Sequence, residues 1–166
     1  MACQVDPKRL LWRFINSAGG VSNRRVLKDA IFLAKEYGFY PFPFSFKRSS
    51  GLGTSRKSDE IDANVDELIE EGFVFDTGGP ATLKILKSPK AEVDPELEVA
   101  ARLTKRIHPD DLSMLAAFRM AFLREKDIQG DSVSDEDLRI AAAWRLGWPL
   151  EMFNRIEDGL MACKGA

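Results

Sequence analysis

The amino-acid sequence predicts an α-rich α+β fold, on three observations. Apolar residues recur at helical spacing in three early segments, a short β-hairpin pattern follows them, and four more helical patterns fill the second half of the chain. The length of 166 residues suits one domain, or two small ones that share a core. We expect an N-terminal domain over residues 6–86, a linker over residues 87–94 and a helical C-terminal domain over residues 95–163.

Polar residues with short side chains mark where the three early helices begin. Such residues accept a hydrogen bond from a backbone N–H of the first turn. The N-cap residues that we expect are Asp6, Ser22 and Ser58. Proline at the first helical position supports the first start, and a glycine ends each of the three apolar patterns.

The segment 39–46 changes from a helical to an alternating pattern. Tyr40, Phe42, Phe44 and Phe46 alternate with two prolines and a serine. Because proline has no N–H to donate to a sheet ladder, we expect an extra Phe-rich extended strand at an edge, able to pair with the later hairpin. The rings either pack in the core, which is the commoner case, or form a stacking platform for single-stranded bases.

A β-hairpin is expected directly after the third helix. Residues 73–75 and 81–86 have apolar strand character, and the Gly- and Pro-containing stretch 76–80 between them is typical of a turn. The later helices have their own start signals, which are Asp94-Pro95, His108-Pro109, Ser134 and Trp148-Pro149.

Three helices followed directly by a two-stranded hairpin is the element order of a winged helix. The runs 26–34 (VLKDAIFLA) and 61–74 (IDANVDELIEEGFV), with the aromatic segment between them, resemble the winged-helix (wHTH) core of many prokaryotic regulators. More faintly, they resemble YwgA-type and Panacea-type small prokaryotic proteins. The resemblance covers roughly residues 8–86 and consists of hydrophobic patterns, so it implies the fold far more strongly than an activity.

The net charge of −2 hides a strong separation of charge along the chain. Residues 1–57 hold eleven Lys or Arg residues and three acids, whereas residues 58–80 hold eight acids and no base. A separation of this kind bears on partners or on self-pairing, and not on the fold.

The basic segment leads to the first functional hypothesis, a nucleic-acid-associated protein of the winged-helix, helix-turn-helix class. Segment 47–57 is rich in Gly and Ser and carries four cations next to a helix N-terminus, where phosphates bind readily. We expect a DNA-binding regulator of transcription that contacts the DNA backbone. The expected nucleic-acid-binding residues are Arg24, Arg25, Lys47, Arg48, Arg56 and Lys57. Alternatively, the basic segment pairs with the acidic helix of its own chain or of a neighbouring copy.

The acidic third helix leads to the alternative, a protein-interaction module. A DNA-binding winged helix places its third helix in the major groove, where acidic side chains would be repelled by phosphates. The helix would instead bind a basic protein partner, or two copies would form a homodimer through complementary charged surfaces. The residues expected to take part are Asp59, Glu60, Asp62, Asp66, Glu67 and Glu70.

The sequence offers little to catalysis, so we expect no enzyme, no metal and no cofactor. The single histidine, His108, precedes a proline at a helix start, where histidine usually caps or faces solvent. Cys3 and Cys163 have no metal-site spacing; we expect free thiols, with a disulfide between the two ends as the alternative. No apolar run approaches the roughly 20 residues of a membrane span, and no signal-peptide pattern is present, so we expect a cytoplasmic protein.

Overall fold

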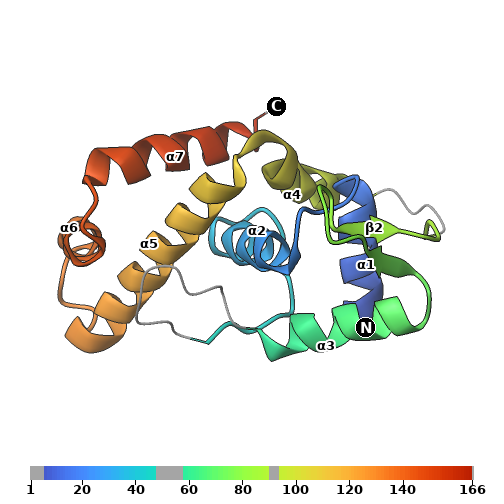
Figure 1. Ribbon diagram of the computed structural model, residues 1–166. Helices are drawn as coiled ribbons and strands as arrows, with labels where there is room; N and C mark the ends of the chain where they lie inside the picture. Colours follow the sequence, from blue (N-terminus) through green and yellow to red (C-terminus); the bar gives the residue numbers. More distant parts are fainter. Residues whose placement is uncertain (1–5, 48–57, 90–93, 166) are drawn as a thin grey trace.

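The computed structural model describes residues 6–47, 58–89 and 94–165. Within these ranges the chain forms seven α-helices and one two-stranded antiparallel sheet, which confirms the α-rich α+β class (Figure 1). The elements are α1 (Pro7–Ser17), α2 (Arg24–Glu36), α3 (Asp59–Glu70), β1 (Val74–Asp76), β2 (Leu83–Ile85), α4 (Pro95–Arg106), α5 (Pro109–Gln129), α6 (Asp135–Leu146) and α7 (Leu150–Ala162).

Side-chain caps fix most of the helix starts. The predicted caps that accept a first-turn N–H in the structure are Asp6, Ser58, Asp94, His108 and Ser134. The prediction of Ser22 as the cap of α2 is wrong by one residue. Asn23 takes that position, and its side-chain oxygen accepts a hydrogen bond from the N–H of Val26 at 2.9 Å.

Helix α2 lies at the centre of the molecule and is buried on every side. Residues 26–34 are all buried, including the charged residues Lys28 and Asp29. Helices α4 and α5 pack against α2, while α1 packs against α3 and α4 (Figure 1). Buried residues from both halves of the chain therefore form one hydrophobic cluster. The division into domains at residues 87–94 stays a prediction.

The segment between α1 and α2 adds a contact to the small sheet. Strands β1 and β2 pair antiparallel, with Val74 opposite Ile85. Val21 forms a bridge with Leu83: its N–H donates to the Leu83 oxygen at 3.0 Å and its oxygen accepts from the Leu83 N–H at 2.9 Å. Directly before the bridge, Gly20 has a φ of +97°, and a Cβ there would lie 3.2 Å from the Leu83 oxygen. This close approach favours glycine.

The Phe-rich segment is extended but is not a strand. The prediction of an extra edge strand is wrong, because residues 39–47 join no ladder and the additional hairpin contact comes from Val21. Phe42 and Phe44 are instead fully buried, and Phe42 packs edge-on against Phe14 of α1 with ring centroids 5.6 Å apart. The prolines remove backbone donors, and the rings gain more by packing against helices than the backbone would gain from a sheet edge.

The core role of these rings can be tested by Phe42→Ala. Deleting the ring leaves a cavity beside Phe14, so we expect the free energy of unfolding to fall by about 3–5 kcal/mol in urea denaturation. Ser45→Ala, at an exposed position of the same segment, is the matched control and should change it by less than about 0.5 kcal/mol. Equally small effects of the two variants would contradict the core assignment.

Candidate functional site

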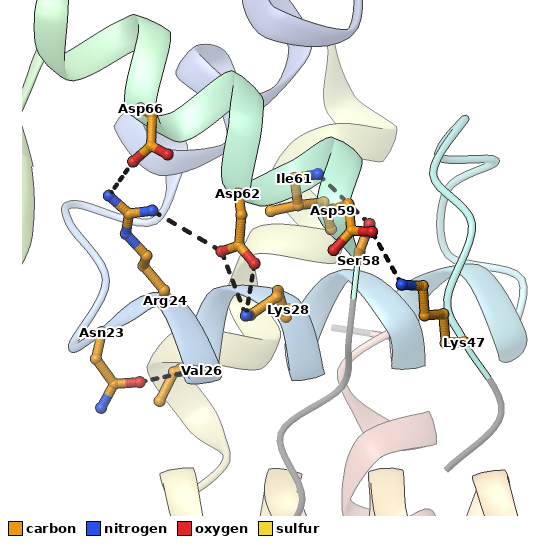
Figure 2. A network of polar contacts seen from close by, with 10 residues as sticks. All are labelled: Asn23, Arg24, Val26, Lys28, Lys47, Ser58, Asp59, Ile61, Asp62 and Asp66. Atoms are coloured by element: carbon orange, nitrogen blue, oxygen red, sulfur yellow. Dashed lines mark hydrogen bonds and ion pairs between the residues drawn. The ribbon is translucent and has the colours of Figure 1, made fainter.

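Helix α3 is held so that its acids face the cations of its neighbours. The buried hydroxyl of Ser58 accepts a hydrogen bond from the N–H of Ile61 and caps the helix. Ile61, Val65 and Leu68 bury the apolar stripe of α3. Because these positions use one face of the helix, the acidic side chains lie on the others. Figure 2 shows Asp62 and Asp66 pointing toward the cations of α2.

Asp62 lies at the centre of the charged contacts between α2 and α3. The Lys28 ammonium lies 3.3 and 3.2 Å from the two Asp62 oxygens, and Arg24 places one nitrogen 3.9 Å from the same carboxylate (Figure 2). Arg24 also donates to Asp66 at 2.6 Å. The side chain of Lys28 is only 11% exposed. A charge that is so far removed from water needs a counter-charge, and Asp62 supplies it.

Two further cations pair with the ends of α3. Lys8 of α1 donates to Glu71 at 2.6 Å and lies 3.6 Å from Glu67. The hydrogen bond to Glu71 raises the pKa of the Lys8 ammonium above its ordinary value. At the other end Lys47 lies 3.0 Å from Asp59, but these side chains are 66% and 83% exposed. Water and salt screen this exposed pair far more than they screen the contact of Lys28.

The residues expected to bind nucleic acid do not form one described surface. Arg24 and Lys47 are paired with acids of α3. Arg25 donates to the hydroxyl of Ser113 in α5, and its Nε lies 4.0 Å from the buried carboxylate of Asp29. The three other expected residues, which are Arg48, Arg56 and Lys57, lie outside the described residues.

The residues expected to bind a basic partner divide into two groups. Four of them lie within ion-pair distance of a cation of the same chain, namely Asp59, Asp62, Asp66 and Glu67. Glu60 and Glu70 are exposed, and no Lys or Arg of the described ranges forms an ion pair with either. Cations of residues 1–57 and acids of residues 58–80 thus partly pair with each other within the chain. Within the described residues, Glu60 and Glu70 are the acids of this set that no Lys or Arg pairs with.

Sequence reasoning missed Lys28, although a signal for it existed. Lys28 stands inside an otherwise apolar run that is predicted to be buried, and a buried lysine requires an acidic partner. Its partner Asp62 is 34 positions away, so the spacing alone does not identify it.

A second polar network joins the end of α2 to α6 and α7. The Tyr37 hydroxyl donates to Glu157, and the Arg139 guanidinium donates to the same carboxylate at 3.0 and 2.5 Å. Burial and the bond to Glu157 raise the pKa of the Tyr37 hydroxyl, which stays protonated at neutral pH. The hydrogen bonds among these three side chains link the end of α2 to α6 and α7 and stabilise their packing.

The described residues hold no cluster typical of metal or membrane chemistry. No group of three or more His, Cys, Asp or Glu side chains is placed to hold a metal ion in the described ranges. Among the same residues, none of the helices has the length and apolar character needed to cross a membrane. The buried Cys163 thiol donates to the Gly159 carbonyl at 3.5 Å, while Cys3 lies outside the described residues.

The importance of the central pair can be tested by Asp62→Asn. This change leaves the buried Lys28 ammonium without its counter-charge, so we expect the free energy of unfolding to fall by about 1–3 kcal/mol. Lys47→Ala breaks the exposed pair and should cost less than about 1 kcal/mol. Urea denaturation at low and high salt measures both effects. Equal losses for the two variants would contradict the distinction between a buried and an exposed pair.

Comparisons of the chain with protein-family models, with curated proteins and with solved structures find no match. The resemblance to winged-helix regulators and to YwgA-type or Panacea-type proteins therefore stays a prediction from the sequence.

Proposed function

We propose that the chain is a winged-helix protein that binds a basic protein partner through the outward acids of α3. The observation that carries this proposal is the division of charge on α3. Cations suited to binding phosphate, such as Arg24, are paired with acids of the same chain, while Glu60 and Glu70 stay exposed.

The winged-helix part of the proposal is supported by the order of the elements. Helix α1 is followed by the bridging residue Val21, then by α2, α3 and the hairpin of β1 and β2. The Val21 bridge adds a third backbone segment to the hairpin. Gly72, with a φ of +78°, turns the chain from α3 directly into the hairpin.

The surplus of acid on α3 favours a protein partner over the DNA major groove. The stretch from Asp59 to Glu71 carries seven acids and no base, and four cations of the described residues pair with it. Among the described residues, the acids of this stretch therefore outnumber the cations that pair with them. A negative surface steers a basic partner toward the helix and repels a phosphate backbone.

A labelled oligolysine peptide tests the acidic surface directly. The double variant Glu60→Gln, Glu70→Gln should weaken binding roughly 2- to 10-fold in fluorescence anisotropy, because each exposed charge contributes below about 1 kcal/mol. The control is Glu98→Gln, Glu151→Gln, which removes the same net charge from exposed positions of α4 and α7. Equal weakening by both double variants would mean that only net charge matters, and it would overturn the proposal.

A second candidate function is contact with a nucleic-acid backbone, and one observation favours it. Lys47 and Asp59 are both highly exposed, so a phosphate could replace Asp59 at small cost. Lys47 also borders the segment 48–57, which holds three more cations and no acid. As a regulator, the protein would contact the phosphates of DNA through the basic segment. Such contacts fix its position on the duplex but do not select a base sequence.

A salt titration of binding to a random DNA duplex tests this second candidate. The affinity should fall steeply with salt, and Arg56→Gln, Lys57→Gln should reduce the slope of log K against log salt by about 2. Arg124→Gln, Lys126→Gln in α5 is the matched control and should leave the slope unchanged. Failure to bind any duplex or single strand at low salt would exclude this function without affecting the oligolysine result.

A further inference from the structure

An exposed apolar face on α6 is not explained by either proposed function. Trp144 is 85% exposed, and Ile140 one turn earlier is 50% exposed. Ile128, near the end of α5, is 63% exposed. Helix α6 lies at the end of the molecule away from α1, α3 and the hairpin (Figure 1). Ile140 and Trp144 stand four positions apart on α6, so their exposed side chains are neighbours on one side of the helix and form an apolar patch that can take part in an interaction.

A hollow of about 560 Å³ lies directly beside the Trp144 ring. Glu125 of α5 and Ala141, Trp144 and Arg145 of α6 line it. Its polar wall is fixed, because Arg145 pairs with the buried Glu125 carboxylate at 2.6 Å and Gln129 donates to the same group at 2.6 Å. The face therefore presents a projecting ring and, next to it, a preformed depression.

We propose that this face is a homodimer interface in which Trp144 of each copy enters the hollow of the other. A two-fold interface uses the same patch on both copies, so the patch must be complementary to itself. A ring beside a hollow meets that condition, since each copy supplies one of each. The interface is remote from α3, so the inference goes beyond the proposed function and does not depend on it.

The charges of α6 fit a second copy in the antiparallel direction. The first turn of the helix holds Asp135, Glu136 and Asp137, and the last turn holds Arg145. With Ala141 at the two-fold axis, Asp137 of one copy would lie opposite Arg145 of the other, because the two residues stand four positions on either side of Ala141. The small Ala141 side chain also allows two helices to approach closely. Arg145 can serve both Glu125 and the second copy, because a guanidinium has five N–H donors.

The same geometry predicts a weak dimer. An interface formed by one pair of α6 helices and the residues beside them buries an area at the lower end of the roughly 1,200–2,000 Å² that stable interfaces bury. We therefore expect a dissociation constant of roughly 1–100 μM. Trp144 at the centre of the contact should provide most of the affinity. Tryptophan is enriched among the few interface residues that carry most of the binding energy.

Sedimentation velocity over a range of protein concentrations tests the proposal on the full chain. The wild type should shift from monomer to dimer, and its tryptophan emission should move to shorter wavelength as Trp144 becomes buried. Trp144→Ala should weaken the dimer at least roughly tenfold. Asp137→Arg should weaken it about 3- to 10-fold, because it places a like charge opposite Arg145 of the second copy. Leu86→Ala, at an exposed apolar position far from α6, is the matched control and should change nothing.

Two results would overturn the inference. One is a wild type that stays monomeric at every concentration up to about 1 mM, well above the expected dissociation constant. The other is a dimer that Trp144→Ala leaves intact, which would place the contact elsewhere on the chain. Because Trp144 is exposed, the variant should keep the urea-unfolding midpoint of the wild type, so loss of the dimer can be separated from loss of the fold.

Discussion

The burial of residues 26–34, the central part of α2, is the constraint on which the rest of the structure depends. A helix that is buried on every side needs packing partners in several directions, and α4 and α5 from the second half of the chain supply two of them. It also carries Lys28 into the interior, where an ammonium is costly without a counter-charge. The contact between Lys28 and Asp62 meets this need, and it ties α3 to the N-terminal half of α2.

The acidity of α3 therefore has a structural part and a surplus part. Asp62 and Asp66 are used to hold the cations of α2, and Glu71 holds Lys8 of α1. The residues that remain available to a partner are those that pair with nothing in the described chain, such as Glu60 and Glu70. The helix therefore attracts a basic surface less strongly than its total charge suggests.

Local signals were sufficient to predict the helices, and tertiary contacts explain what was missed. Caps such as Ser58 and Ser134 act within one turn, so the sequence alone locates them. The alternation around Phe42 is the same for a strand and for an extended segment packed on helices, and only the tertiary structure distinguishes them. The charge blocks indicated that pairing within the chain was an option, but not which residues would pair. Trp144 stands one turn after Ile140 in an ordinary helical pattern, so the sequence does not indicate that its ring is exposed.

The sharing of α2 between the two halves also affects how the chain is made. Residues 6–86 are translated before residues 95–129. They contain α1, α2, α3 and the hairpin, but not α4 and α5, which pack against α2. Until α4 and α5 have been synthesised, the apolar surface of α2 that packs against them has no cover. The nascent first half would therefore expose an aggregation-prone apolar surface during translation. Its final packing would form only after α5 (Pro109–Gln129) has been synthesised.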